Sequence, residues 1–237
     1  EYAREYVAAV DLRIAQSRAA LNERDITRAS RTLPDYFYGV GSFPYNEGYD
    51  FVSNLKASGG WAAVSAAFGR PPASTEQVLH PEKYRENEAP LQVDLPNLAA
   101  SLGGGWKRLE EDTLGELGLR LILAEAIGPV AAGEAARGWG GDRYQLLRRG
   151  DEGPLAIVIR TRWDSPEDAD EFVALYRVAA ADRDGFAEQA TALTGALASR
   201  TWVSTRATLR VTRTAAGVDV YISEDPTAIP AFETALR

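Results

Sequence analysis

The sequence of 237 residues contains no cysteine, no methionine and only one histidine, His80. Without cysteine there is no thiol nucleophile and no thiolate zinc site, and one histidine cannot form a multi-histidine metal site. No run of about 18 apolar residues occurs, so no segment is expected to span a membrane, and no apolar signal segment begins the sequence. The missing initial methionine indicates a mature or trimmed fragment, or a sequence from which modified methionines are left out.

Acidic residues outnumber basic ones, 34 to 26, which gives a formal net charge of −8 and a pI near 4.9. This charge repels phosphate backbones and anionic lipid, so we expect neither nucleic acid nor a membrane surface as a partner. A small molecule or a peptide remains as the expected ligand. With 45% hydrophobic residues, the chain is long enough to bury a core as one large domain or two small ones.

Helical patterns dominate the first part of the sequence. Apolar residues at three- and four-residue steps predict an amphipathic helix over residues 1–21. Residues 28–45 combine proline, glycine and aromatic residues and are predicted to form an aromatic-rich connection on the surface of the core. Helical spacing returns over residues 49–55 and ends at Gly59-Gly60, and a short helix is expected over residues 61–68.

The next stretch carries a capping motif and a glycine-rich bend. Ser74 followed by Gln77 matches a capping box, and Pro81 is expected to stop that helix after little more than one turn. The segment Gly103–Trp106 lacks the strand-then-helix context of a nucleotide-binding loop, so we interpret it as a bend.

Two helices and a turn are predicted in the middle of the chain. Thr113 and Glu116 repeat the capping pattern and are expected to open an apolar helix that Gly128-Pro129 closes. A further alanine-rich helix should run to about Arg137, where Gly138–Gly141 is predicted to make a turn.

Beyond the turn the apolar pattern changes to period two, which predicts strands. The predicted strands pair as two hairpins and cover residues 143–148, 155–162, 208–213 and 218–222. Ser165-Pro166 and Asp225-Pro226 each predict the start of a helix.

The order of these elements predicts an α+β protein, with a helical N-terminal half followed by an antiparallel sheet of four or five strands and packed helices. Charge and proline cluster over residues 86–96, so we expect a boundary there. Residues 1–90 would form a helical, aromatic-rich region and residues 91–237 an α+β region, either as two domains or as one continuous domain.

The most specific motif is Ser-Thr-Glu-Gln-Val-Leu-His-Pro-Glu-Lys-Tyr at residues 74–84. Further motifs are Phe43-Pro-Tyr45, Gly59-Gly60-Trp61, Pro71-Pro72, Gly138–Tyr144 and Trp163-Asp164. Together they resemble a family of uncharacterised exported proteins and lipoproteins of bacteria and haloarchaea. Members of that family resemble zinc metallopeptidases of the gluzincin kind, with a His-Glu-x-x-His helix upstream of the part seen here. The resemblance implies an exported or cell-surface location, and the metal-binding helix is absent from this sequence.

His80 is the first candidate for a site because it lies in the most specific motif. It would act as a ligand or general base if partners surround it, and otherwise as a structural residue at a helix end. Glu76 would contact a ligand, or else join Glu82 and Glu86 in solvated ion pairs with His80, Lys83 or Arg85. We predict a pocket where the aromatic tract of residues 36–49 meets the His80 segment, unless those rings belong to the core. The predicted ligand-binding residues are His80, Glu76, Tyr84, Tyr38, Tyr45 and Tyr49.

Three other chemistries stay open. The acids between Asp164 and Glu171 would bind Ca²⁺ or simply occupy the start of a helix, where negative charge is favoured. A serine–histidine–aspartate arrangement could use His80, although the sequence has no Gly-x-Ser-x-Gly elbow and Ser74 is better explained as a helix cap. Hydrolysis by a pair of carboxylates needs only two acids in a cleft.

These observations favour a non-catalytic binding or structural module of an exported or surface protein with metallopeptidase-like ancestry. The alternative is the C-terminal part of an active zinc-dependent peptidase whose metal site lies upstream. We expect no cofactor in this chain itself, and zinc if the upstream metal helix exists.

Overall fold

A computed structural model describes residues 34–182, 185–189 and 199–237. The helix predicted over residues 1–21 lies outside these residues. The chain divides into two compact units, Glu1–Asn46 and Glu47–Arg237. Residues 47–90 thus share a unit with the sheet, and the separate folding of residues 1–90 stays a prediction.

In the described part of the first unit, residues 35–42 are helical. The predicted irregular connection is therefore wrong here, because α2 (Asp35–Ser42) occupies its middle. Pro34 stands at the N-cap, where its missing N–H costs no helical hydrogen bond. Gly39 and Gly41 weaken a helix but do not prevent it.

The second unit begins with α3 (Glu47–Gly69), which is two helices joined at Gly59 and Gly60. Gly60 has a φ of 65°, which glycine adopts without strain, so the break predicted at this pair is confirmed. The two halves of α3 pack Phe51, Leu55 and Val64 around the buried ring of Tyr84, as a small core of their own.

Two short helices follow α3. The helix α4 (Thr75–Leu79) has the predicted cap, because the Gln77 amide donates to Ser74 Oγ over 3.2 Å. Pro81 ends α4, as expected, but it also opens α5 (Pro81–Glu86), which was not predicted. Proline is favoured at the first helical position because the N–H it lacks has no partner there.

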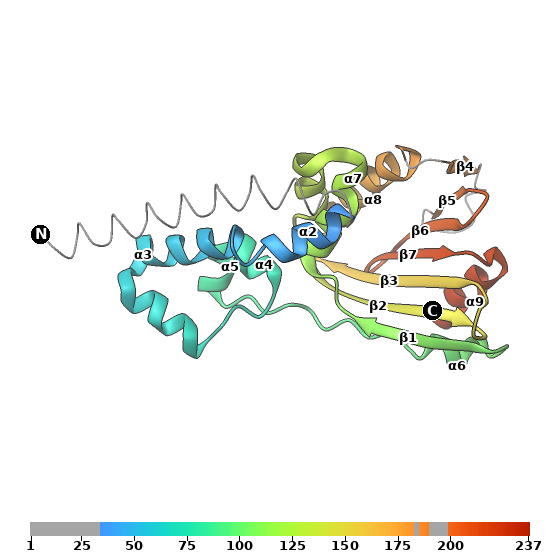
Figure 1. Cartoon of the computed structure of the whole chain (residues 1–237), viewed down its shortest axis with the longest axis horizontal. Helices are drawn as coiled ribbons and strands as arrows, with labels where there is room; N and C mark the ends of the chain where they lie inside the picture. Colours follow the sequence, from blue (N-terminus) through green and yellow to red (C-terminus); the bar gives the residue numbers. More distant parts are fainter. Residues whose placement is uncertain (1–33, 183–184, 190–198) are drawn as a thin grey trace, which may run out of the picture. The chain divides into compact units, whose positions relative to one another are not determined.

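A seven-stranded antiparallel sheet forms the rest of the unit, in the order β1-β2-β3-β7-β6-β5-β4 (Figure 1). Its strands are β1 (Trp106–Asp112), β2 (Trp139–Arg149), β3 (Leu155–Trp163), β4 (Ala187–Gln189), β5 (Ser199–Val203), β6 (Thr208–Thr214) and β7 (Gly217–Ser223). The fold class is confirmed as α+β, and both predicted hairpins are present as β2–β3 and β6–β7. The number of strands was underestimated.

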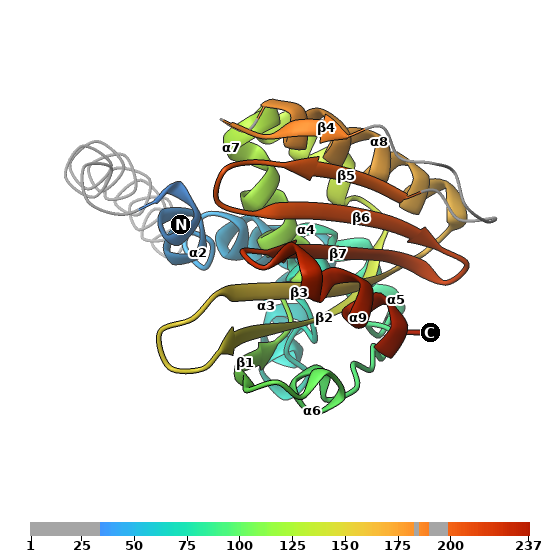
Figure 2. The ribbon, with the colours of Figure 1, turned by 90° about the vertical axis from the view of Figure 1, so that its right-hand side faces the viewer.

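Helices cover both faces of the sheet. On one face, α7 (Gly115–Ala136) and α8 (Pro166–Asp182) pack on Trp139, Trp202 and other buried residues of the larger core. On the other face, α6 (Leu98–Leu102), the 3-10 turn η1 (Pro226–Ala228) and α9 (Ile229–Ala235) bury Leu147 and Val158. Figure 2 shows the sheet from the α9 side, with α7 and α8 behind it.

Several predicted helix boundaries are confirmed. Ser165 Oγ accepts from the Asp168 amide at the start of α8, and Asp225 caps the turn at Pro226. Gly128, with a φ of 78°, divides α7 into the two predicted helices. None of the described helices is both long and apolar enough to cross a membrane.

The turn predicted at Gly138–Gly141 is wrong beyond its first residue. Gly138 has a φ of 73° and makes the turn, whereas Trp139 already opens β2. The register between β2 and β3 shifts between Trp139 and Gly141, so Gly140 is the extra residue of a bulge. This bulge sits at the edge of the site described next.

Candidate functional site

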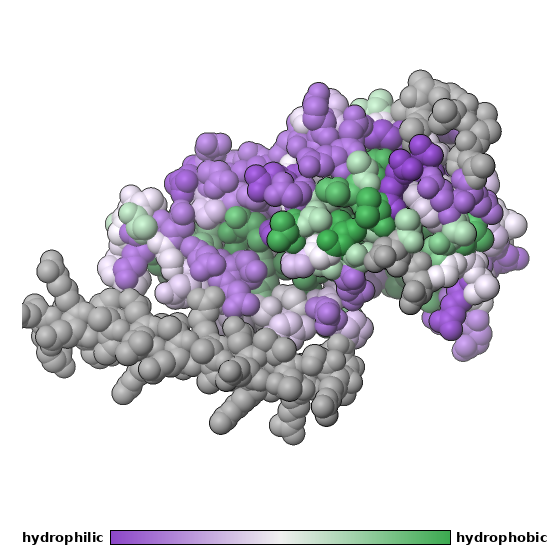
Figure 3. Space-filling model, turned by 90° about the horizontal axis from the view of Figure 1, so that it is seen from above, coloured by the Kyte–Doolittle hydropathy of each residue, from purple (hydrophilic) through white to green (hydrophobic). Residues whose placement is uncertain are grey.

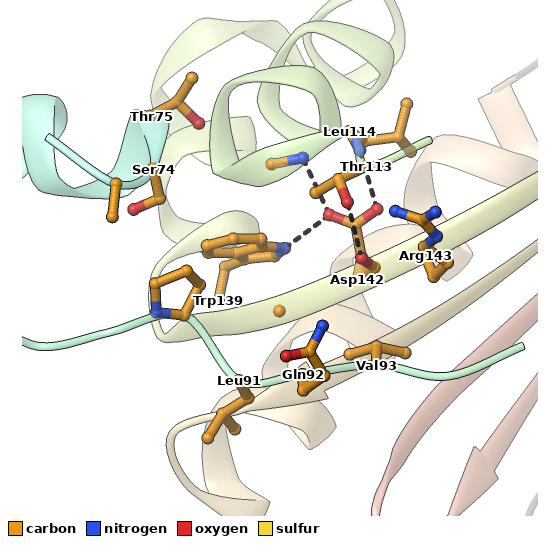
Figure 4. Close-up of a pocket in the computed structure, with 14 residues that line it drawn as sticks. Ser74, Thr75, Leu91, Gln92, Val93, Thr113, Leu114, Trp139, Asp142 and Arg143 are labelled. Atoms are coloured by element: carbon orange, nitrogen blue, oxygen red, sulfur yellow. Dashed lines mark hydrogen bonds between the residues drawn. The ribbon is translucent and has the colours of Figure 1, made fainter. Parts of the chain in front are cut away.

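A pocket of about 360 Å³ lies where the starts of α4 and α7 meet the start of β2. Figure 4 shows Ser74 and Thr75 at one end of it, Arg143 at the other end, and the indole of Trp139 between them. The segment of residues 90–93, which leads from α5 toward α6, forms a further wall.

The start of α7 is held by Asp142. Its carboxylate accepts hydrogen bonds from the amides of Leu114 and Gly115, both over 2.8 Å, and from the indole of Trp139 over 2.9 Å. Burial raises the pKa of Asp142, while these three N–H donors act in the opposite direction. The predicted cap at Thr113 is wrong, because the Thr113 hydroxyl donates to the Asp142 carbonyl and a residue from β2 caps the helix instead.

The start of α4 is capped by one hydroxyl group and fixed against α7 by another. Ser74 Oγ caps α4, and Thr75 Oγ1 accepts from the amide of Leu117 over 3.3 Å. Gly115 permits this contact, because a Cβ at that position would lie 2.6 Å from Thr75 Oγ1 and its φ is 71°. The two helix starts therefore meet as a rigid corner of the pocket.

The wall of residues 90–93 crosses close to β2. The Leu91 amide donates to the Gly140 carbonyl over 2.7 Å, and a Cβ on Gly141 would lie 2.3 Å from the Leu91 carbonyl oxygen. Only glycine allows this approach. Val93 is buried, whereas Leu91 and Gln92 are exposed.

Arg143 forms the charged end of the pocket. Its side chain is 38% exposed, and its Nε donates to Glu111 Oε1 over 3.1 Å. Glu111 also accepts from Gln145 over 3.1 Å and from Arg108. The single negative charge of Glu111 is therefore shared between two arginines.

His80 lies beside this pocket rather than in its lining. Its Nε2 is 2.9 Å from Glu116 Oε1 on α7, and its Nδ1 is 3.7 Å from Glu82. The hydrogen bond to Glu116 raises the pKa of His80, against the opposing effect of burial. Glu116 is 1% exposed, and its Oε2 receives no hydrogen bond from the described residues. His80 thus joins the end of α4 to the start of α7.

Glu76 belongs to a neighbouring charged cluster around Lys83. The Lys83 ammonium lies 2.7 Å from Glu76, 2.7 Å from Glu88 and 2.5 Å from Asp164. Burial raises the pKa of Glu76 to about 7, and the three carboxylates raise that of Lys83. The same three carboxylates could hold a metal ion by their spacing. In this structure the ammonium of Lys83 supplies the positive charge among them.

The predicted Ca²⁺ ligands at the start of α8 have separate partners. Asp164 accepts from Lys83, Asp168 from Ser165, and Asp170 from Arg213 over 2.7 Å. These contacts agree with the alternative, in which the acids occupy the positive end of a helix and pair with nearby donors.

The remaining predicted ligand-binding residues are aromatic. Tyr84 is 5% exposed, stacks edge-on with Phe51, and donates its hydroxyl to the Arg70 carbonyl, so it is part of the small core. Tyr38 and Tyr45 belong to the first unit, and Tyr49 lies on α3 of the second. The six predicted residues do not line the pocket in Figure 4, and their role in ligand binding stays a prediction.

Sequence reasoning missed Trp139, Asp142 and Arg143 as pocket residues. A signal was present, since the stretch Gly138–Tyr144 combines three glycines with an aspartate, an arginine and two aromatic residues. Three glycines so close together permit a near approach of other backbone, as happens at Gly141.

A second, more apolar hollow of about 770 Å³ lies between α7 and α8 and is lined by Ile127, Leu175 and Val178 among others. Figure 3 shows apolar side chains gathered on this face of the molecule. The ion pair of Arg177 with Glu188, at 3.7 Å, borders the hollow.

Comparison with known proteins finds one family. A family model described as a domain of unknown function (DUF8575) matches residues 104–233, which is more than half of the chain. This range contains the sheet with α7, α8 and most of α9, and hence the β2 and α7 sides of the pocket. No curated protein and no solved structure matches.

Proposed function

Since the chain belongs to the DUF8575 family, a family defined as a domain of unknown function, we propose its function first from the geometry of the pocket. The protein is a binding module that holds a small molecule or a short peptide in the pocket between α4, α7 and β2. The observation that carries this proposal is the preformed pocket of about 360 Å³ with mixed polar and apolar walls.

The size and lining of the pocket support ligand binding. Pockets for small ligands have volumes of roughly 300–1,000 Å³, and combine an apolar surface with a few oriented polar groups. Here Leu91 and Leu114 supply accessible apolar surface, while Gln92 and Arg143 supply polar groups. The walls are tied together by the hydrogen bonds of Asp142 and Thr75. A pocket held open in this way loses little entropy when a ligand binds.

The arrangement of hydroxyl groups supports binding without catalysis. Ser74 and Thr75 accept backbone N–H groups, and the Thr113 hydroxyl donates to a carbonyl. A nucleophilic hydroxyl needs a base within hydrogen-bond reach. His80, the single histidine, directs its Nε2 to Glu116. We extend the proposal to an exported or surface protein with metallopeptidase-like ancestry, on the resemblance of the motif at residues 74–84. The same resemblance leaves the C-terminal part of a zinc peptidase as the alternative.

A fragment screen tests the proposal. Ligand-observed NMR with a library of neutral and charged fragments should find ligands of the wild-type chain. Ala73 is exposed and lines the pocket, so Ala73→Trp should fill it without disturbing the core. We expect these ligands to bind at least about tenfold more weakly to this variant.

The matched control is Ala100→Trp, since Ala100 is an exposed residue of α6 and does not line the pocket. It should bind every fragment as the wild type does. Fragments that bind equally well to Ala73→Trp and to the wild type would contradict the pocket as the binding site.

A further inference from the structure

The two charged side chains of the pocket lining, Asp142 and Arg143, differ in their availability to a ligand. Asp142 is 4% exposed, and its carboxylate already accepts three hydrogen bonds. A cationic ligand would therefore meet a carboxylate whose oxygens are occupied and buried. Asp142 holds the pocket together and does not select the ligand.

Arg143 is free to contact a ligand with its outer nitrogens. Only its Nε is engaged, and within the described part of the chain no hydrogen bond reaches its two terminal nitrogens. Glu111 is shared with Arg108, so its negative charge does not act on Arg143 alone. Arg143 thus presents its terminal N–H groups and its positive charge at one end of the pocket (Figure 4).

We infer that the pocket binds ligands that end in a carboxylate, which the terminal nitrogens of Arg143 would recognise. This inference rests on the proposed function, because it names the ligand class of the same pocket. A guanidinium binds a carboxylate through two parallel N–H···O bonds, which gives both orientation and charge complementarity. The body of the ligand would extend from Arg143 past Leu114 toward Ser74 and Thr75, where hydrogen-bonding groups without formal charge line the pocket.

Two sources of such a carboxylate are conceivable, a small organic acid and the C-terminus of a peptide. The probes are therefore N-acetyl-leucine with its amide, and the peptide N-acetyl-Ala-Ala-Leu with a free or an amidated C-terminus. Binding is measured by ligand-observed NMR titration at pH 7. We expect the acid of one pair or both to bind about tenfold more tightly than its amide. The pair that shows the preference identifies the source.

Arg143→Gln should remove this preference while the amides bind as before. The matched control is Arg137→Gln, since Arg137 is 65% exposed and lies outside the pocket lining. It should keep the preference. If Arg143→Gln does not fold, Arg143→Lys retains the charge without the fork and should reduce the preference only in part.

The outcomes separate this inference from the proposed function. Acids and amides that bind equally to the wild type, or a preference that survives Arg143→Gln, would overturn the carboxylate inference alone. The carboxylate inference alone is also overturned if none of the four probes binds although fragments sensitive to Ala73→Trp are found. If no fragment is sensitive to Ala73→Trp, the pocket itself is rejected, and the inference falls with it.

Discussion

Two joints hold helices against the sheet, and they have opposite chemistry. The apolar joint attaches α8 to the sheet, with Phe172 fully buried between Trp163 at 4.7 Å and Tyr176 at 5.4 Å between ring centroids. The charged joint attaches α4 and α5 to the sheet region, through Lys83 and its three carboxylates and through His80 with Glu116.

Because their chemistry differs, the stability that each joint contributes should respond differently to pH. The apolar joint gains free energy from removing hydrocarbon from water, which does not depend on pH. The charged joint loses hydration and regains it only through its ion pairs, so its contribution depends on the charge state of each member. The pocket lies beside the charged joint, because α4 and α7 form part of both.

Breaking the apolar joint should give the largest effect. Phe172→Ala removes a ring that is 0% exposed, and we expect the free energy of unfolding to fall by about 3–5 kcal/mol. Urea unfolding at pH 5 and at pH 8 should give the same loss. The control is Val178→Ala on the same helix, where the side chain is 56% exposed and the change should stay within about 0.5 kcal/mol. A loss from Phe172→Ala that depends on pH would contradict the comparison.

Breaking the charged joint should give a smaller effect that does depend on pH. Burial raises the pKa of Glu76 from 4.5 to about 7. A raised carboxyl pKa means that the folded state binds the proton more tightly than the unfolded state does. The stability gained from protonation of Glu76 is therefore fully present below pH 4.5 and is lost as pH rises through about 7. Lys83→Met removes the ammonium that faces Glu76, and we expect a loss of about 2–3 kcal/mol at pH 8.

At pH 5 Glu76 binds a proton, so the loss from Lys83→Met should be roughly half as large or less. Unfolding by urea at both pH values measures the two losses. Lys107→Met is the matched control, because the side chains of Lys107 and its partner Asp151 are 60% and 88% exposed. Their ion pair should therefore contribute little to stability at either pH. An equal loss from Lys83→Met at pH 5 and pH 8 would show that Glu76 is not the titrating partner.

The sequence predicted those features whose partners are close in the chain. The caps at Ser74, Ser165 and Asp225 lie within three residues of the amides they accept from, and the β6–β7 hairpin closes over a two-residue turn just before Gly217. Such contacts are encoded by local spacing, so one sequence suffices to find them.

Features with distant partners could not be found in this way. The helix α7 is capped by Asp142, which lies 27 and 28 residues after the amides it binds, so the local signal at Thr113 was misleading. The strand β1 is an edge strand with mostly exposed positions and charged residues, and therefore lacks the alternation that reveals a strand. The pocket is assembled from four segments between Ala73 and Arg143.

The smallest expected effect concerns the second contact of the charged joint. His80 is the sole histidine, so its imidazole gives one set of ring resonances in an NMR titration. The hydrogen bond to Glu116 raises its pKa above 6.5, which means that the stability it contributes is fully present below pH 6.5 and is lost as pH rises through the folded value.

Glu116→Gln should lower the pKa of His80, because a neutral amide replaces the carboxylate on α7 that lies 2.9 Å away. Glu82→Gln is the control, since that carboxylate is 59% exposed and 3.7 Å from Nδ1, and should move the pKa less. Arg120, which lies 3.8 Å from Glu116, already weakens the effect of that carboxylate. Equal shifts in the two variants would mean that His80 senses the general negative charge of the region, and that α4 and α7 are not joined by this contact.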